Sequence, residues 1–138
     1  MINLEYIICS FVTLFMCQII KFIIESIKDK KLKIRRLIGG SGGMPSSHSS
    51  FTTSLTTLLG LKLGVNSPIF AVAFIFTLIT SYDAMGVRLE SGRHAEALNI
   101  ILNDENKFKE KIGHEPLEVI GGVVVGFIVA FTFYLLKY

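Results

Sequence analysis

The chain has 138 residues, of which 51% are hydrophobic and 18% are charged, and its formal net charge is +3. This length fits one domain, but the chain is too apolar and too poor in charge for an ordinary water-soluble fold. The composition therefore excludes a soluble globular domain and predicts a single membrane domain over residues 1–138.

Four apolar stretches have the composition of helices in a bilayer, whose hydrocarbon core of about 30 Å takes roughly 20 residues to cross. They cover residues 4–27, 51–63, 68–82 and 116–136. The first and last are long enough to cross alone. The second is rich in Ser and Thr and the third is short before Asp83, so we expect both to be shielded by neighbouring helices. The predicted fold is an all-α integral membrane bundle of about four transmembrane helices.

Basic residues gather in two loops, one after the first span and one between the third and fourth. They are Lys28, Lys30, Lys31, Lys33, Arg35, Arg36, Arg88, Arg93, Lys107, Lys109 and Lys111. The positive-inside rule predicts that both loops face the cytoplasm and both termini face out, as in a protein of the bacterial cytoplasmic membrane. Such a patch would attract anionic headgroups. The chain has no aromatic platform or reading helix, so we expect no nucleic-acid partner.

The first predicted helix ends in a line of polar residues. Gln18, Lys21, Glu25 and Lys28 are spaced by three, four and three residues, which places them on one helix face. A lysine within a span is costly unless it faces protein or water, and it is then a functional candidate. We expect Lys21 to face inward; the alternative is that it extends to the nearby interface.

The stretch GGSGGMPSSHSS, residues 39–50, combines a glycine-rich loop with the start of a helix. Glycine tolerates positive φ and lets the backbone approach a ligand closely, and Pro45 is expected in the first helical turn. A helix N-terminus with free N–H groups attracts anions, phosphate above all. A plain linker before a capped helix is the alternative. The candidate phosphate-binding residues here are Gly43, Ser46, Ser47 and His48.

The third span ends in SYDAMGVR, where a carboxylate follows an apolar run. At a membrane boundary we expect Asp83 to be paired with Arg88, Lys21 or a histidine. The next stretch, SGRHAEALNIILN, has an apolar stripe and predicts an amphipathic helix lying on the cytoplasmic surface of the membrane. That stripe consists of Ala95, Leu98, Ile101 and Leu102.

The last span opens with GHEPLEV, in which Pro116 suits the first helical turn. His114 lies four residues before Glu118, so the carboxylate can orient one ring nitrogen and leave the other for nucleophilic or acid–base work. A solvated histidine and glutamate at a helix start is the alternative. Gly122 and Gly126 form a small face suited to close helix packing.

The motifs GGMPSSHSS, YDAMGVR and GHEPLEVIGG, in this order and at these intervals, resemble the divergent branch of the membrane phosphatidic acid phosphatase type 2 (PAP2) superfamily, whose wider relatives include vanadium haloperoxidases. The similarity runs from Gln18 to Gly126. The resemblance implies an all-helical membrane fold. For the mainstream superfamily it also implies phosphate-ester hydrolysis through a phosphohistidine, with no metal or other cofactor.

The resemblance also implies roles for single residues. PSSH matches the family's PSGH, so His48 resembles the general acid that protonates the leaving oxygen, and Ser46 with the backbone of Ser47 resembles part of the phosphate cradle. In GHEPLE, His114 resembles the nucleophile. Glu118 resembles its orienting carboxylate, which is an aspartate in the family.

The family's cationic residues are only partly matched. Lys21 is the preferred phosphate-binding lysine and Arg88 the preferred arginine, while Lys28 with Arg35 has the family's lysine-to-arginine spacing without its following proline. The family's arginine six residues before the nucleophile is replaced by Phe108. A phosphoryl transition state needs several positive donors, so this chain would supply them from a rearranged set. The predicted substrate ligands are Lys21, Ser46, Ser47, Asp83, Arg88 and Gly43.

Three hypotheses for function follow. The first is a membrane phosphatase acting on a phospholipid or a prenyl (di)phosphate, with catalytic residues His114, His48 and Glu118. The second is a non-catalytic protein that binds an anionic lipid or moves a lipid. The third is a metal site drawn from His48, Asp83, His94, His114 and Glu118, although no two of the histidines have a compact ligand spacing. Four spans make a thin bundle that a homodimer would complete.

Overall fold

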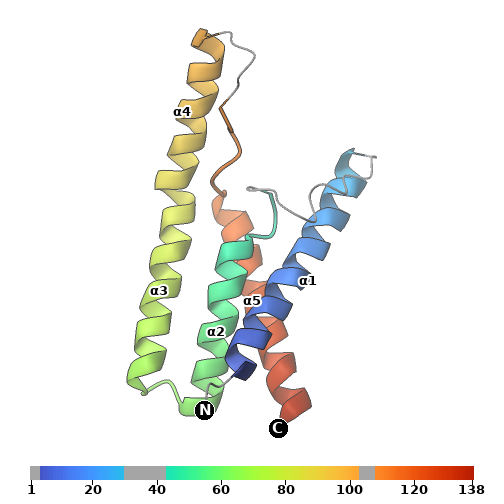
Figure 1. Cartoon of the computed structure of the whole chain (residues 1–138), viewed down its shortest axis with the longest axis vertical. Coiled ribbons are helices and arrows are strands. Elements are labelled where there is room, and N and C mark those ends of the chain that lie inside the picture. Colours follow the sequence, from blue (N-terminus) through green and yellow to red (C-terminus); the bar gives the residue numbers. More distant parts are fainter. Residues whose placement is uncertain (1–3, 30–42, 103–107) are drawn as a thin grey trace.

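The computed structural model describes residues 4–29, 43–102 and 108–138. Within these residues the chain forms helices and no strand, as predicted (Figure 1). The helices are α1 (Leu4–Asp29), α2 (Ser47–Leu63), α3 (Pro68–Met85), α4 (Val87–Leu102) and α5 (Pro116–Lys137). The glycines of 39–42 and the basic run of 30–36 lie outside the described residues.

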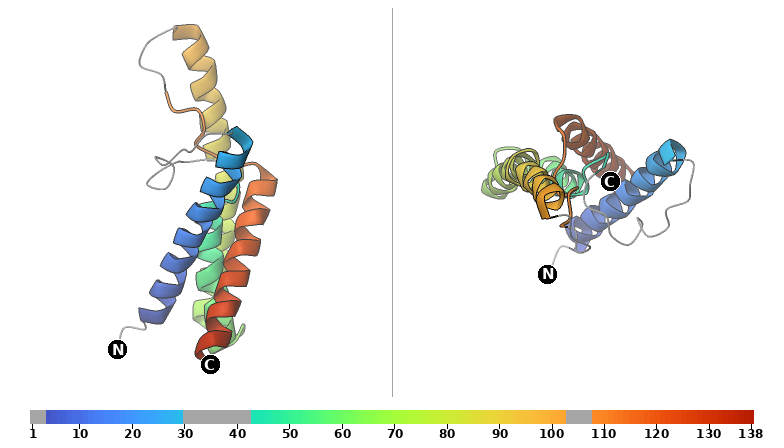
Figure 2. Two further views of the ribbon diagram at one scale, coloured as in Figure 1. Left: turned by 90° about the vertical axis from the view of Figure 1, so that its right-hand side faces the viewer. Right: turned by 90° about the horizontal axis from the view of Figure 1, so that it is seen from above.

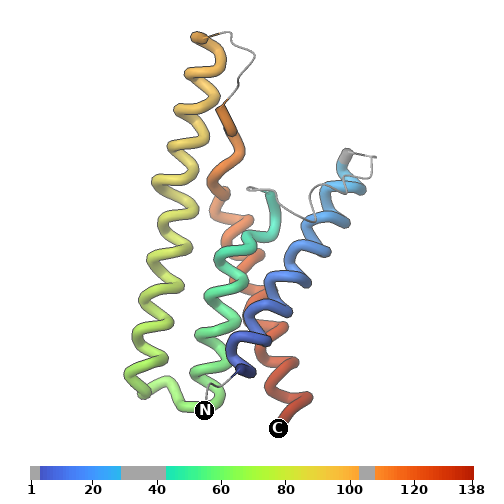
Figure 3. The backbone as a smooth tube through the Cα atoms, in the orientation of Figure 1, coloured from blue at the N-terminus to red at the C-terminus, as the bar shows by residue number. Residues whose placement is uncertain are grey.

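Helix α2 occupies the centre of the bundle, with α1, α3 and α5 packed around it. Seen along the bundle, α1 and α3 lie on opposite sides of α2 (Figure 2), and no Cα atoms of α1 and α3 approach within 8 Å. The path of the chain brings the end of α1, the start of α2, the end of α3 and the start of α5 to one end (Figure 3). Segments remote in sequence therefore meet there.

Close contact between α2 and α5 depends on the predicted glycine face. A Cβ atom on Gly122 would lie 2.4 Å from the carbonyl oxygen of Ser46, and one on Gly126 would lie 2.5 Å from that of Ser50. Only glycine lets the two backbones come this near, as in other tightly packed membrane helices. The Ser46 N–H donates to the Glu118 carbonyl oxygen at 2.8 Å, which joins the starts of α2 and α5.

Three stretches of the described chain are long and apolar enough to cross a membrane: Leu4–Lys28, Pro68–Leu102 and Pro116–Lys137. Helix α2 has 17 residues, and its hydroxyl-bearing face is buried among the other helices, as predicted. The expectation that α3 is also shielded is wrong. Most of its large side chains are exposed, because α3 packs mainly on α2 and leaves its other faces free for lipid.

Helix starts follow local capping chemistry with one exception. Ser67 caps α3 with Pro68 as its first residue, and Pro116 begins α5. Pro45 is not in the first turn of α2 as predicted. It precedes the cap residue Ser46, whose Oγ accepts from the Ser49 N–H at 3.4 Å.

The predicted amphipathic helix exists as α4, but it does not lie across the end of the bundle. It continues upward from α3 and extends beyond the other helices (Figures 1 and 2). Around Gly86 the helical hydrogen bonds persist, from the Gly86 N–H to Tyr82 and from the Glu90 N–H to Gly86. A break this short leaves the helix direction almost unchanged.

The return segment 108–113 runs back along α4. Asn99 joins the two, since its Nδ2 donates to the Phe108 carbonyl at 2.9 Å and its Oδ1 accepts from the Phe108 N–H at 2.7 Å. Gly92 and Gly113 permit the close approach, because a Cβ on either would lie within 2.3 Å of backbone atoms of the other segment. This path delivers His114 to the end of the bundle.

Candidate active site

A cavity of about 390 Å³ lies where the segments converge. Its polar lining comes from four parts of the chain and consists of Gln18, Lys21, Ser47, His48, Arg88 and His114. Its apolar lining consists of Phe11, Leu14, Phe51 and Ile112. The predicted lysine, arginine and two histidines therefore share one hollow although they span more than 90 positions of sequence.

His114 is held in a defined orientation at the wall of this cavity. Its side chain is buried, with the residue 3% exposed, and its backbone N–H donates to the Ala84 carbonyl at 3.0 Å. Its Nδ1 lies 2.9 Å from Glu118 Oε2. A carboxylate can only accept, so Nδ1 carries the hydrogen and Nε2 keeps a free lone pair. The predicted pairing thus exists, and Nε2 is the ring nitrogen that Glu118 does not bind.

Glu118 is itself positioned by the start of α5. The same Oε2 accepts from the backbone N–H of Glu115 at 3.2 Å, an arrangement that closes the N-terminus of the helix. Glu118 does not line the cavity. Glu118 therefore contacts the His114 ring from outside the cavity lining, at a helix end that its own capping contact closes.

Burial lowers the pKa of His114, and the hydrogen bond and charge of Glu118 oppose that effect by raising it. The positive charges of Lys21 and Arg88 lower the pKa further. The net direction is downward, which favours the neutral imidazole. A neutral ring is the form that can act as a nucleophile at physiological pH.

Lys21 faces the interior, as predicted, and does not extend to the interface. The residue is 1% exposed, and its Nζ donates to Ser47 Oγ at 3.2 Å. The buried thiol of Cys17, one turn earlier, lies 3.7 Å from the same hydroxyl and 3.5 Å from the Pro45 carbonyl oxygen. These contacts join α1 to the start of α2. Lys28, the alternative phosphate ligand, is exposed and does not line the cavity.

Arg88 reaches the cavity from the first turn of α4. Its Nε donates to Asp83 Oδ2 at 2.5 Å. Of the partners that the sequence allowed for Asp83, the structure therefore shows Arg88. Asp83 does not line the cavity. The carboxylate therefore anchors the guanidinium from behind. A fixed guanidinium presents planar N–H donors suited to phosphate oxygens.

Of the residues predicted to bind phosphate at the start of α2, some line the cavity and others do not. Ser47 and the exposed His48 line the cavity. Ser46 is 0% exposed and caps the helix, so its hydroxyl lies outside the cavity lining. Gly43 has a φ of 85°, a left-handed conformation that glycine adopts without strain, and it also lies outside the lining.

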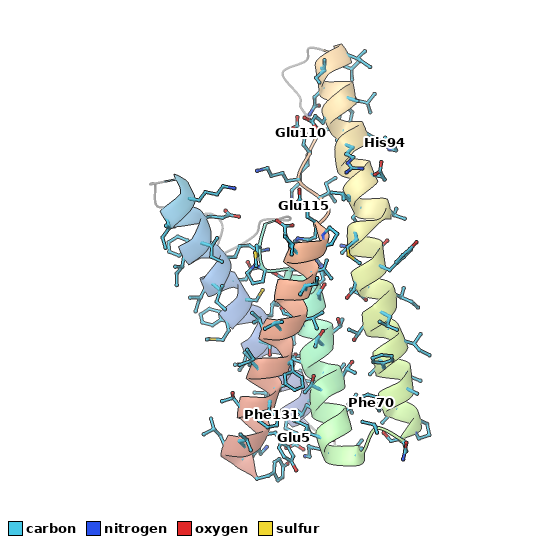
Figure 4. The ribbon with its side chains drawn as sticks, turned by 180° about the vertical axis from the view of Figure 1, so that it is seen from behind. Glu5, Phe70, His94, Glu110, Glu115 and Phe131 are labelled. Carbon is cyan, nitrogen blue, oxygen red and sulfur yellow. The ribbon has the colours of Figure 1, made fainter. Side chains whose placement is uncertain are left out.

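His94, a candidate for the predicted metal site, does not line the cavity. His94 is exposed on α4, farther out than Glu115 at the start of α5 (Figure 4). No three His, Cys, Asp or Glu side chains in the described parts of the chain gather as metal ligands would.

The cavity lining includes residues that the sequence did not predict. Gln18 was not assigned a role, although its spacing from Lys21 pointed to the same face. The sequence has no pattern that distinguishes the apolar lining residues from residues that face lipid.

Known proteins resemble this chain over most of its length. Residues 2–129 match the profile of a protein family described as the Divergent PAP2 family. The membrane protein YuiD of Bacillus subtilis (strain 168) is 37% identical over 136 aligned residues, which cover 85% of each chain. No solved structure matches the chain. Together with its apolar helices, the similarity identifies an integral membrane protein.

Proposed function

The chain belongs to the Divergent PAP2 family, and from this premise we propose that it is a membrane phosphatase. The substrate is a lipid phosphate or a prenyl (di)phosphate, and the reaction passes through a phosphohistidine at His114. The observation that carries the proposal is the meeting of His48, His114, Lys21 and Arg88 on one cavity, with Nδ1 of His114 held by Glu118.

In the first step, His114 Nε2 attacks the phosphorus atom, and the bond from phosphorus to the ester oxygen breaks. The leaving oxygen takes a proton from His48, the other histidine of the cavity wall. Positive charge develops on the His114 ring as the P–N bond forms, and the Glu118 carboxylate stabilises it through Nδ1–H. In the second step, water attacks phosphorus, His48 takes its proton, and the bonding pair returns to His114 as inorganic phosphate leaves.

In this scheme Lys21 and Arg88 stabilise the negative charge of the phosphoryl transition state. Lys21 and Arg88 both line the cavity, and both are held by partners, Ser47 Oγ and Asp83. Pre-oriented donors contribute more than mobile ones because they need no reorganisation as charge develops. They take the place of the family arginine that is Phe108 here.

The apolar part of the cavity supports a lipid substrate. Phe11 and Leu14 lie on α1 about two to three turns before Lys21, toward the other end of the bundle, and Phe51 lies one turn beyond Ser47 on α2. The rings of Phe11 and Phe51 meet edge to face with centroids 5.6 Å apart. Together these three side chains form an apolar wall of the cavity that α1 and α2 supply. A phosphate held near Lys21 would place its hydrocarbon chain along this wall.

The test is phosphate release by the purified full chain in nanodiscs from lysophosphatidic acid, phosphatidic acid and farnesyl phosphate. We expect turnover of at least one substrate by the wild type and none by His114→Ala. His94→Ala is the matched control, since His94 is exposed on α4 outside the cavity, and it should keep wild-type activity. A folded wild type that releases no phosphate from any of the three would refute the proposal.

A second candidate function is binding of an anionic lipid without turnover. The observation that favours it is Phe108 at the position of the family arginine, half-exposed and away from the cavity. Binding of a lipid phosphate that survives His114→Ala, with no turnover by the wild type, would select this function over hydrolysis.

For location, we propose the bacterial cytoplasmic membrane, with the cavity end toward the cytoplasm and both termini outside. The described basic residues of the cavity end include Arg88, Arg93, Lys109 and Lys111, and the positive-inside rule supports this orientation. A C-terminal alkaline phosphatase fusion should be active, and a fluorescent C-terminal green fluorescent protein fusion would contradict the orientation. We also propose that two copies associate, which mass measurement in nanodiscs would test.

A further inference from the structure

The lining of the cavity changes from polar to apolar over a short distance on two helices. On α1, the apolar Leu14 lies four residues before the polar Gln18. On α2, the apolar Phe51 lies four residues after the polar Ser47. Four residues of helix rise by about 6 Å. The apolar wall of Phe11, Leu14 and Phe51 therefore begins about 6 Å from the polar part of the lining.

Two contacts show that this change falls at the same level on both helices. Cys17 Sγ lies 3.7 Å from Ser47 Oγ, which aligns the polar parts. The rings of Phe11 and Phe51 meet with centroids 5.6 Å apart, which aligns the apolar parts. Lys21 Nζ reaches the polar level, since it donates to Ser47 Oγ at 3.2 Å. A phosphate bound by Lys21 therefore lies near Ser47, and the first carbons of its ester lie against the apolar wall.

Hydroxyl groups near the apolar wall are already bonded within their own helices. Ser50 and Ser54 donate to carbonyl oxygens of α2 at 3.0 and 2.8 Å, and Thr13 donates to a carbonyl oxygen of α1 at 2.9 Å. None of the three lines the cavity. A polar atom of a ligand at this depth would lose water without gaining a hydrogen bond from the wall, which is unfavourable.

We infer that the site selects the phosphate ester of a simple long-chain alcohol, prenyl or alkyl, over a glycerol-based lipid phosphate such as phosphatidic acid. The inference rests on the proposed function. A depth of about 6 Å corresponds to about five bonds of an extended carbon chain. A prenyl or alkyl chain carries only carbon and hydrogen over that length. Glycerol instead carries an oxygen on both carbons that follow the phosphate-bearing carbon, and those oxygens would meet Phe51 and its neighbours in the apolar wall.

The rest of a long hydrocarbon chain needs no enclosed pocket. Phe11 is 57% exposed, so the apolar wall is continuous with the apolar surface of α1 that faces lipid. The hydrocarbon beyond the wall stays in the bilayer. Selection therefore acts on the carbons next to the phosphate, and Phe11, Leu14 and Phe51 are the residues that determine it.

The test compares two substrates that carry the same hydrocarbon chain. One is hexadecyl phosphate, and the other is hexadecyl glycerol phosphate, in which an ether bond joins the chain to glycerol. The full chain is reconstituted in nanodiscs with equal mole fractions of either substrate, and phosphate release is measured. We expect kcat/KM to be about 10- to 100-fold higher for hexadecyl phosphate, the scale set by leaving buried polar atoms unpaired.

Farnesyl phosphate is a third substrate, and it distinguishes the two sources of a simple chain. It should share the advantage over hexadecyl glycerol phosphate. A kcat/KM for farnesyl phosphate above that for hexadecyl phosphate would identify a prenyl chain as the preferred one, and the reverse order would identify an unbranched chain.

Substitutions in the apolar wall test its role directly. Phe51→Asn places an amide at the level of the glycerol oxygens and should reduce the preference for hexadecyl phosphate by about 10-fold. Phe51→Leu keeps the wall apolar and should keep the preference. Phe131→Asn is the matched control, because Phe131 stacks on Phe127 of α5 and does not line the cavity. Leu14→Asn makes the same change on the facing helix and replaces Phe51→Asn if that variant does not fold.

The outcomes distinguish the inference from the proposed function. A wild type that hydrolyses hexadecyl glycerol phosphate with a kcat/KM equal to or above that for hexadecyl phosphate refutes the selection, and the phosphatase stands. A wild-type preference that Phe51→Asn and Phe131→Asn change to the same extent refutes the role of the apolar wall. A folded wild type that releases no phosphate from any of the three substrates refutes the proposed function, and this inference with it.

Discussion

Replacing Gly122 by Ala should disable the site without touching any residue that lines the cavity. The added Cβ would lie 2.4 Å from the Ser46 carbonyl oxygen, whereas ordinary contact begins near 3.4 Å. The starts of α2 and α5 must therefore separate by about 1 Å. That shift strains the 2.8 Å hydrogen bond from Ser46 to Glu118 and moves His48 relative to His114.

The expected magnitudes follow from this geometry. A displacement of about 1 Å between reacting groups costs about 100-fold in rate. Overpacking of a close interface costs about 1–3 kcal/mol of unfolding free energy. Phosphate release and unfolding in denaturant would measure the two effects on one preparation. Both losses are expected in Gly122→Ala.

The neighbouring glycine supplies the control. A Cβ on Gly121 would meet the Met44 side-chain end at 3.1 Å, and that flexible chain can move aside at little cost. Gly121→Ala should therefore keep activity and stability near the wild type. If Gly122→Ala also keeps both, the close approach of α2 and α5 does not set the geometry of the site and the reasoning fails.

Other predictions address the charges of the site. Lys21→Met should lower kcat/KM by about 100-fold in the phosphate-release assay, because it removes a buried cation from the cavity lining. Asp83→Asn should raise KM by releasing Arg88, but change the unfolding free energy by no more than about 1 kcal/mol, because the pair is more than one-third exposed; an unchanged KM would count against the anchoring role. In a pH profile, kcat/KM should fall as His114 becomes protonated, at a pH below the ordinary histidine pKa of about 6.5. Glu118→Gln should move this acid limb to still lower pH, because the carboxylate raises the His114 pKa in the wild type and its loss lowers that pKa; a limb that stays in place would show that another group sets it.

The helices and most of their first residues could be predicted from the sequence, because short stretches of sequence determine them. Long apolar runs make helices in a bilayer, and Ser67 with Pro68 starts a helix by its own backbone chemistry. The predictions that are wrong concern features that depend on contacts with distant segments of the chain. Pro45 precedes the helix because the Ser46 N–H is bound by Glu118 and its hydroxyl caps α2. Helix α4 keeps the direction of α3, which no stripe of apolar residues could reveal.

The order of apolar and polar segments already required the site residues to lie at one end of the bundle, since each crossing reverses the direction of the chain. It did not say which way each helix is rotated about its axis. That rotation comes from packing between remote backbones, such as Gly122 against Ser46. Lys21 and Lys28 lie on the same face of α1, and only the tertiary structure shows that Lys21 is buried against Ser47 at the start of α2 while Lys28, two turns farther along the helix, is exposed. The same packing places Ser47 on the cavity wall and Ser46 behind it, because neighbouring residues of a helix point in different directions.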